Sequence, residues 1–456
     1  MKYRILHVFN CFKCLYRSIL FALLPIFLYE CKSDISGWKS IQMENDLISL
    51  QVVPEIGGRV LQYKLGDYGF FYVNKNLFEK SPPLSGLGEG NKWLNYGGDK
   101  LWLAPQGWDN DQQWPGPPDS TLDGQSYALE IINPNIIRLT SKEDHRSGVQ
   151  LSRTIKIFDG TTRVSIDATM KNIDTKPRRW GIWDHTQFDA GNRHGRGYNQ
   201  NFWGYCPLNK NSILPNGYEV LHGLTNNISY KPDYNSGMMK VQYKYNVGKI
   251  GIDCSAGWIA TIDAEDGYVF VHRFEYEYYK PYPDNSSVTI WMNGLGKINA
   301  WGKIIQMPEN PKDNPFVFES EIISPYATLN PGQDYTFHYD WYSARIDHGL
   351  GIIECNSFGV ICEPLAVGIK GATLNITGKF GFFYDGTISI SAKYKDGSPE
   401  KVLTSPIEIS PLESLNLNLK IEDLTNLSDI ETISISLFDK KKKVIGEFAS
   451  TELTKD

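Results

Sequence analysis

Apolar and polar positions alternate with a period of two through much of the chain. Apolar side chains occupy every second position in five segments, at residues 48–52, 164–170, 388–394, 415–419 and 433–437. This period is typical of half-buried β-strands. Clusters of Gly, Pro, Asn and Asp separate the segments, and no long amphipathic helical pattern accompanies them. The pattern predicts an all-β protein built from one or more sandwiches.

The distribution of tryptophan divides the chain near residues 344–365. All 12 Trp residues precede this boundary. The segment that follows has the alternation of about seven short strands, which is the size of an immunoglobulin-like sandwich. For a chain of 456 residues, we therefore predict three parts. They are an export signal at 1–31, a large β-domain at 40–347, and a smaller C-terminal β-sandwich at 360–456 that serves as an accessory module.

The N-terminus has the pattern of an export signal. Four basic residues precede an apolar stretch at 19–29. This stretch is too short to span a bilayer comfortably, as is typical of a signal peptide. Cys31 follows, with Leu28 three residues before it, as in a bacterial lipoprotein signal. We expect export to the periplasm or outer membrane of a bacterium, with a lipid on Cys31 as the membrane anchor. An ordinary cleaved signal peptide is the alternative.

Composition narrows the choice of partner. The net charge of −6 argues against nucleic acid, whose partners usually carry a basic face. The 12 Trp, 26 Tyr and 21 Phe suit strands, and their flat faces can also stack on sugar rings. An exported chain permits disulfides, and Cys355 and Cys362 are close enough in sequence to pair.

Candidate binding residues are concentrated in a Trp-rich segment at 95–119. Long loops with this composition usually serve a function, although a plug over the end of a sheet is the alternative. Arg59 follows the two-glycine turn at 54–58 and is either a binding residue or a surface arginine of a hairpin. From the Trp-rich segment the candidate substrate-binding residues are Asn95, Tyr96, Asp99, Lys100, Trp102 and Gln106.

Candidate catalytic residues occur in two later segments. His185 is flanked by carboxylates and aromatic residues at 180–191, and a His beside carboxylates can be held ready to donate a proton. Glu319 and Glu321 are two residues apart, so both lie on one face of a strand, as suits acid/base work. A structural His and a polar sheet face towards water are the alternatives. Around His185, the further candidate substrate-binding residues are Trp183, Asp184 and Gln187.

These segments, in this order, resemble the galactose mutarotase (aldose 1-epimerase) superfamily. Residues 184–191 resemble the family's Asn-His-(Ser/Thr)-Tyr-Phe-Asn-Leu segment, 318–321 the strand with its catalytic Glu, and 329–333 its Pro-Gly turn. The strings at 97–106 and 282–284 are similar to a bacterial family of unknown function, family 4380, in the same superfamily. The resemblance implies a β-supersandwich of two large antiparallel sheets, with a ligand groove on the concave side.

The resemblance also implies a reaction. Glu321 or Glu319 would take the proton from the anomeric hydroxyl of a sugar, and His185, protonated near neutral pH, would donate a proton to the ring oxygen from the opposite side. No metal or organic cofactor is expected. Tyr96 stands where the family has a second His, and the family's substrate-binding Asp corresponds to Asp184, Asp99 or Asp284.

Three functions remain open from the sequence. The first is a mutarotase-like enzyme that acts on a monosaccharide or oligosaccharide through His185 and a glutamate. The second is a non-catalytic carbohydrate-binding lipoprotein, which the replacement at Tyr96 and the appended C-terminal sandwich favour. The third is a polysaccharide lyase or hydrolase, because one fold hosts many reactions.

Overall fold

The computed structural model describes residues 38–78, 80–422 and 427–453. Across these residues the chain forms strands β1 to β32, and its helices are single short turns such as η3 (Ser120–Gly124). The prediction of an all-β protein is therefore confirmed. No helix in the described part is long and apolar enough to cross a membrane. The expected signal at 1–31 and the lipidation candidate Cys31 lie outside the described residues.

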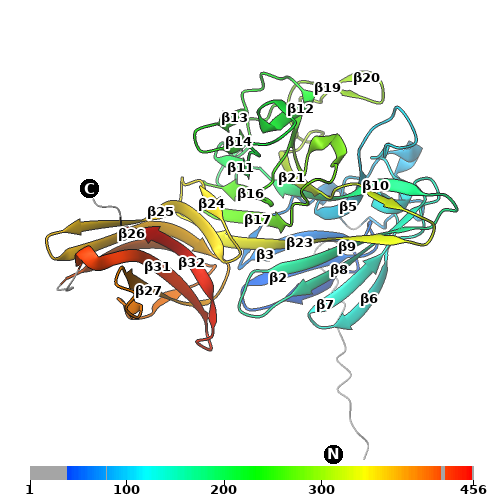
Figure 1. Cartoon of the computed structure of the whole chain (residues 1–456). Helices are drawn as coiled ribbons and strands as arrows, with labels where there is room; N and C mark the ends of the chain where they lie inside the picture. Colours follow the sequence, from blue (N-terminus) through cyan, green and yellow to red (C-terminus); the bar gives the residue numbers. More distant parts are fainter. Residues whose placement is uncertain (1–37, 79, 423–426, 454–456) are drawn as a thin grey trace, which may run out of the picture. The chain divides into compact units, whose positions relative to one another are not determined.

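The first large sheet has eleven antiparallel strands (Figure 1). Two short strands pair at its side, β4 (Tyr68–Gly69) with β3 and β22 (Ala327–Leu329) with β10. The main path runs β1 (Ile41–Glu44), β2 (Ile48–Val53), β3 (Arg59–Leu65), β5 (Asp99–Ala104), β10 (Arg178–Asp189), β21 (Val317–Ile323), β18 (Val288–Met292), β15 (Gly248–Ile252) and β12 (Tyr218–Gly223).

The second large sheet has ten antiparallel strands. A separate hairpin, β19 (Lys297–Ala300) and β20 (Lys303–Gln306), pairs outside both sheets. The order of the second sheet is β13 (Tyr230–Asp233), β14 (Met238–Gln242), β11 (Phe202–Pro207), β16 (Trp258–Asp263), β17 (Tyr268–Phe274), β23 (Asp334–Arg345), β9 (Val164–Asn172), β8 (Val149–Ile157), β7 (Ile136–Thr140) and β6 (Ala128–Asn133).

The two sheets pack face to face around one apolar core. Phe318 of β21 contacts Phe202 of β11, with ring centroids 5.7 Å apart. Tyr63 of β3 donates a hydrogen bond of 2.8 Å to the carbonyl of Thr162, next to β9. The alternation within each strand explains this arrangement, because successive side chains point to opposite faces of a sheet. The prediction of two large antiparallel sheets is confirmed.

Strand β10 is buried on both of its faces. Its core face carries Ile182, Asp184 and Phe188, which are 0% exposed. Its outer face carries Trp183 and His185, which are also buried. Loops therefore cover the outer face of the first sheet at this strand, and the candidate site lies beneath them.

The strands after β23 form two smaller sheets with an apolar core of their own. The predicted alternation at 388–394 and 433–437 falls in strands of the second one, and Ile390 pairs with Ile435. Cys355 and Cys362 are free thiols among the described cysteines, so the pairing considered from the sequence is not formed. One sheet contains β24 (Glu354–Cys355), β25 (Gly359–Lys370), β26 (Thr373–Phe382) and β30 (Ser414–Ile421); the other contains β28 (Lys401–Val402), β27 (Gly386–Tyr394), β29 (Ile407–Ile409), β31 (Ile430–Asp439) and β32 (Val444–Glu452).

Candidate functional site

A row of polar side chains crosses the outer face of the first sheet. His185 of β10 lies opposite Lys100 of β5 on one side and opposite Glu321 of β21 on the other. Glu321 in turn lies opposite Thr289 of β18. Residues directly opposite each other in an antiparallel pair share one face, so these four side chains are neighbours. Glu319 joins the row because it pairs with Gln187.

His185 contacts both candidate glutamates. Its Nε2 lies 3.1 Å from Oε2 of Glu319 and 3.1 Å from Oε1 of Glu321. The second oxygen of each carboxylate is held from elsewhere: Gln187 donates to Oε1 of Glu319 at 2.6 Å, and Thr289 donates to Oε2 of Glu321. The structure therefore brings together the three residues that the sequence analysis selected as catalytic.

Two features of His185 differ from what the resemblance implied. Burial lowers the pKa of His185 well below its usual value, and the charge of Lys100 lowers it further, so the ring is neutral near pH 7. The neighbouring carboxylate of Glu321 raises this pKa but does not outweigh burial. The acid and base also do not face each other across a gap, because atoms 3.1 Å apart leave no room for a sugar ring. Burial raises the pKa of the Glu319 carboxyl.

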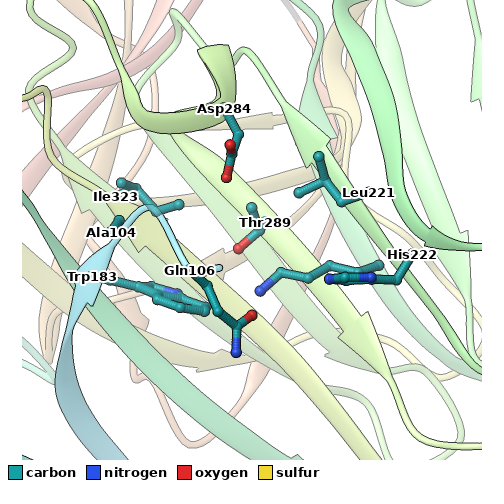
Figure 2. A pocket seen from close by; sticks show the side chains of 9 residues that line it. Ala104, Gln106, Trp183, Leu221, His222, Asp284, Thr289 and Ile323 are labelled. Atoms are coloured by element: carbon teal, nitrogen blue, oxygen red, sulfur yellow. The ribbon is translucent and has the colours of Figure 1, made fainter. Parts of the chain in front are cut away.

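A pocket of about 160 Å³ opens beside this cluster (Figure 2). At roughly 30 Å³ per molecule it would hold about five waters. Asp284, in the turn η5 (Pro283–Asn285), enters the pocket from one side, with Trp183 and Gln106 on the other. The residues that line it are Ala104, Gln106, Trp183, Leu221, His222, Lys249, Asp284, Thr289 and Ile323.

The pocket and the cluster share their neighbours. Lys249 lines the pocket, and its Nζ lies 3.3 Å from Oε2 of Glu321. The same Nζ lies 4.0 Å from the centroid of the Trp183 ring, within the range of a cation–π contact. Trp102 closes the other side of the cluster, with its ring centroid 3.9 Å from that of His185. Burial raises the pKa of the Asp284 carboxyl at the pocket.

Several buried polar atoms of this face have no hydrogen-bond partner among the described residues. Buried polar groups in proteins are normally paired, so each such atom calls for an explanation. Lys100 is the most costly of them, because burial lowers its pKa to about 8 and Arg59 opposes its charge. These atoms are Lys100 Nζ, Trp183 Nε1, His185 Nδ1, Gln187 Oε1 and Glu321 Oε1.

Arg59 is buried away from the pocket. Its guanidinium pairs with the carboxylate of Asp123 at 3.0 Å, and neither side chain is more than 2% exposed. Trp93 and Trp102 donate to the same carboxylate, at 2.7 Å and 2.8 Å. Asp123 therefore holds the Trp-rich segment against the sheet, and Arg59 neutralises it. This segment covers the sheet, as the plug alternative expected, and also contributes Gln106 to the pocket.

Asp99 and Asp184 lie on the core face, away from His185. Asp184 accepts a hydrogen bond of 2.6 Å from Tyr339 of the second sheet. Asp99 accepts one of 2.8 Å from Thr186 and pairs with Arg153. Burial raises the pKa of both carboxyls. Of the three candidates for a substrate-binding aspartate, only Asp284 lines the pocket.

Asn95 and Tyr96 shape the turn that precedes β5. The side-chain oxygen of Asn95 accepts from the backbone N–H of Gly97 at 3.1 Å. Tyr96 is buried against Trp38, with ring centroids 5.3 Å apart. Neither residue lines the pocket.

Sequence reasoning did not find Lys249, Thr289 and His222. Lys249 could have been noticed in the sequence, because it is the one charged residue of β15, a strand in which every position is buried. Thr289 has the ordinary appearance of a strand residue, and only its register with Glu321 reveals it. The cluster His185, Glu319 and Glu321 is also the group of described residues whose side-chain atoms could hold a metal ion.

Comparison with known proteins gives one family match and several structural similarities. Residues 38–194 match the family described as Domain of unknown function (DUF4380). No curated protein matches the sequence at a significant level. The chain is similar in structure to a galactose mutarotase-like protein from Lactobacillus casei ATCC 334, with 13% identity, a TM-score of 0.42, and coverage of 67% of this chain and 99% of that one. A putative aldose 1-epimerase from Escherichia coli K12 gives 12% identity, a TM-score of 0.39, and coverage of 67% and 99%.

Proposed function

We propose that the chain binds a carbohydrate in the pocket beside His185. Sugar hydroxyls both donate and accept hydrogen bonds, while sugar C–H groups stack on aromatic faces. Trp183 lines the pocket with an aromatic ring that a sugar would reach by displacing the Lys249 ammonium, and Gln106, Asp284 and Thr289 offer hydrogen-bond partners. The observation that carries this proposal is the buried Trp183 Nε1, which lines the pocket and has no hydrogen-bond partner among the described residues, so that a sugar hydroxyl could accept from it.

A thermal-shift panel of monosaccharides and oligosaccharides tests this proposal. A ligand that binds only the folded state stabilises it by about 2.7 kcal/mol at a hundred times its Kd. The matched variants are Asp284→Asn, in the pocket, and Asp167→Asn, on an exposed part of β9. We expect at least one sugar to raise the Tm of the wild type and of Asp167→Asn by similar amounts. The same sugar should raise the Tm of Asp284→Asn less. An equal response in both variants would place the sugar elsewhere, and no response to any sugar would refute the proposal.

A second candidate function is interconversion of sugar anomers by His185 with Glu321 or Glu319. The position of these three residues beside the pocket favours it. A sugar ring would have to separate His185 from the carboxylates, because their present contact leaves no space between acid and base. Non-catalytic binding needs no such movement, and cleavage of a polysaccharide is a third possibility for the same groups.

Anomeric-proton NMR on a bound sugar separates these candidates. We predict that His185→Ala and Glu321→Ala each abolish any accelerated anomer exchange while the protein stays folded by circular dichroism. Full exchange activity in either variant would reject the acid/base assignment. Binding with unchanged exchange and no cleavage products would identify a binding protein.

We also propose that the protein is exported and anchored through a lipid on Cys31. The basic, apolar and cysteine-ending order of the first 31 residues supports this. Metabolic labelling with a radioactive fatty acid, compared between the wild type and Cys31→Ser, provides the test. Equal labelling, or none in either protein, would contradict lipidation.

A further inference from the structure

Three ligand atoms converge on one point in the cluster. His185 Nε2 lies 3.1 Å from an oxygen of each glutamate, and all three atoms lie within 4.8 Å of one another. Zinc binds imidazole nitrogen at about 2.0–2.1 Å and carboxylate oxygen at about 2.0–2.2 Å, so the ligand atoms of one ion lie roughly 3–3.5 Å apart. The two observed nitrogen–oxygen distances have this size.

The oxygen of Glu321 that faces His185 has no hydrogen-bond donor of its own. The Glu321 side chain is 0% exposed, and among the described residues Oε1 has only the 3.1 Å contact with His185 Nε2, an atom that lies equally close to Glu319. Lys249 balances the charge of Glu321 through Oε2, and a cation where Oε1 and the oxygen of Glu319 converge would balance the second carboxylate, because unpaired buried charge is costly. A neutral imidazole N–H can donate to only one of the two oxygens that face it.

The second oxygen of each glutamate accepts hydrogen bonds from neighbouring side chains, as the carboxylate ligands of metal sites commonly do. Gln187 fixes Oε1 of Glu319, and Thr289 and Lys249 fix Oε2 of Glu321. In each glutamate one oxygen is therefore held by a neighbouring side chain, and the other oxygen faces His185 Nε2. Such supporting hydrogen bonds orient metal ligands and change metal affinity by about 10–100-fold.

We propose that His185, Glu319 and Glu321 form a binding site for a divalent transition-metal ion. One imidazole with two carboxylates suits Mn²⁺, Fe²⁺ or Zn²⁺ better than Ca²⁺ or Mg²⁺, which prefer oxygen ligands alone. Three protein ligands leave coordination positions open for water or a ligand hydroxyl. This proposal differs from the expectation of no metal, and it does not depend on whether the pocket binds a sugar.

The lysines around the cluster provide a distinctive test. Lys100 is fully buried, pairs across the strands with His185, and has no hydrogen-bond partner in the residues described. Its charge opposes a cation at the cluster. Lys100→Met therefore tightens binding of a metal ion, whereas it would weaken binding of an anion.

Isothermal titration of the EDTA-treated, dialysed full chain with MnCl₂, ZnCl₂, MgCl₂ and CaCl₂, without sugar, tests the site. We expect one Mn²⁺ or Zn²⁺ per chain, with Kd raised at least about tenfold by Gln187→Ala and more by Glu321→Gln. Glu219→Gln, an exposed position on β12, is the matched control and leaves Kd unchanged. Electron paramagnetic resonance of bound Mn²⁺ adds a spectral readout of nitrogen ligation that His185→Gln removes.

Two results would overturn the proposal. One is the absence of binding by both transition ions in a protein that melts cooperatively. The other is equal affinity in wild type and in a folded Glu321→Gln variant, which would mean an adventitious ion elsewhere. Repeating the sugar panel in EDTA distinguishes failure of this proposal from failure of the carbohydrate proposal. If a sugar still binds without metal, the carbohydrate proposal stands whether or not the metal site exists.

Discussion

At the scale of single residues, the buried ammonium of Lys100 lowers the stability of the folded protein. Burial lowers the pKa of Lys100 to about 8 from its ordinary value of 10.5. The folded state therefore holds this proton less tightly than the unfolded state. The cost is fully present below pH 8 and disappears as the pH rises from 8 to 10.5, since the folded state then loses this proton while the unfolded state still holds it.

Lys100→Met should consequently stabilise the protein at pH 7. A shift of this size corresponds to about 3 kcal/mol at about 1.4 kcal/mol per pH unit. Urea unfolding in metal-free buffer at pH 7 and pH 10 measures the difference, which should shrink at the higher pH. Lys171→Met, at an exposed position, is the control and should leave the unfolding free energy within about 0.5 kcal/mol. A Lys100→Met variant that is less stable at pH 7 would contradict the argument.

Trp183 is the aromatic surface of the pocket. Its ring lines the pocket, and Lys249 lies over it at 4.0 Å. Trp183→Ala should weaken sugar binding by about 10–100-fold, corresponding to about 1.4–2.8 kcal/mol. Trp203→Ala removes a half-buried ring that lies outside the pocket and should leave the affinity unchanged. Titration calorimetry with the sugar found in the panel measures both, and equal losses would argue against stacking on Trp183.

At the scale of elements, the two faces of strand β10 have different roles. The core face stabilises the fold, and the outer face carries a residue of the candidate site. Its core face bonds to the second sheet through Asp184 and Tyr339, while His185 on the outer face meets the glutamates. Tyr339→Phe leaves Asp184 without its 2.6 Å donor. It should lower the unfolding free energy by about 1–3 kcal/mol while the sugar affinity is retained.

Denaturant unfolding and calorimetry on the same preparation test this separation. Tyr278→Phe is the control, because the side chain of Tyr278 is 61% exposed and should contribute little to stability. A folded Tyr339→Phe variant that loses sugar affinity would show that the two faces of β10 are coupled.

The same strand shows what the sequence could predict. The spacing of Glu319 and Glu321 predicted that both lie on one face of a strand, and the resemblance to a known family joined them to His185, which is far away in the chain. The sequence could not assign Asp184 to the core face, since β10 is buried on both faces and its pattern does not alternate clearly. Lys249 and Thr289 depend on the register of β15, β18 and β21, which side-chain patterns alone do not determine.

At the scale of the whole molecule, the candidate site belongs to the first large sheet and its loops. Every pocket-lining residue falls between Ala104 and Ile323, and the strands after β23 contribute none of them. The C-terminal sheets have an apolar core of their own, and a further apolar cluster, which contains no pocket-lining residue, joins their first strands to the second large sheet. We therefore propose that these sheets are an accessory module.

Removal of residues 345–456 should leave sugar affinity and metal stoichiometry unchanged. The physical reason is that His185, both glutamates and Lys249 are held by strands β10, β21 and β15, which do not pair with any strand of the C-terminal sheets. Calorimetry on the truncated protein, with circular dichroism as the check of folding, measures the outcome. Unchanged affinity would assign recognition to the two large sheets alone. A truncated protein that is folded but no longer binds would show instead that the C-terminal strands shape the pocket from outside its lining.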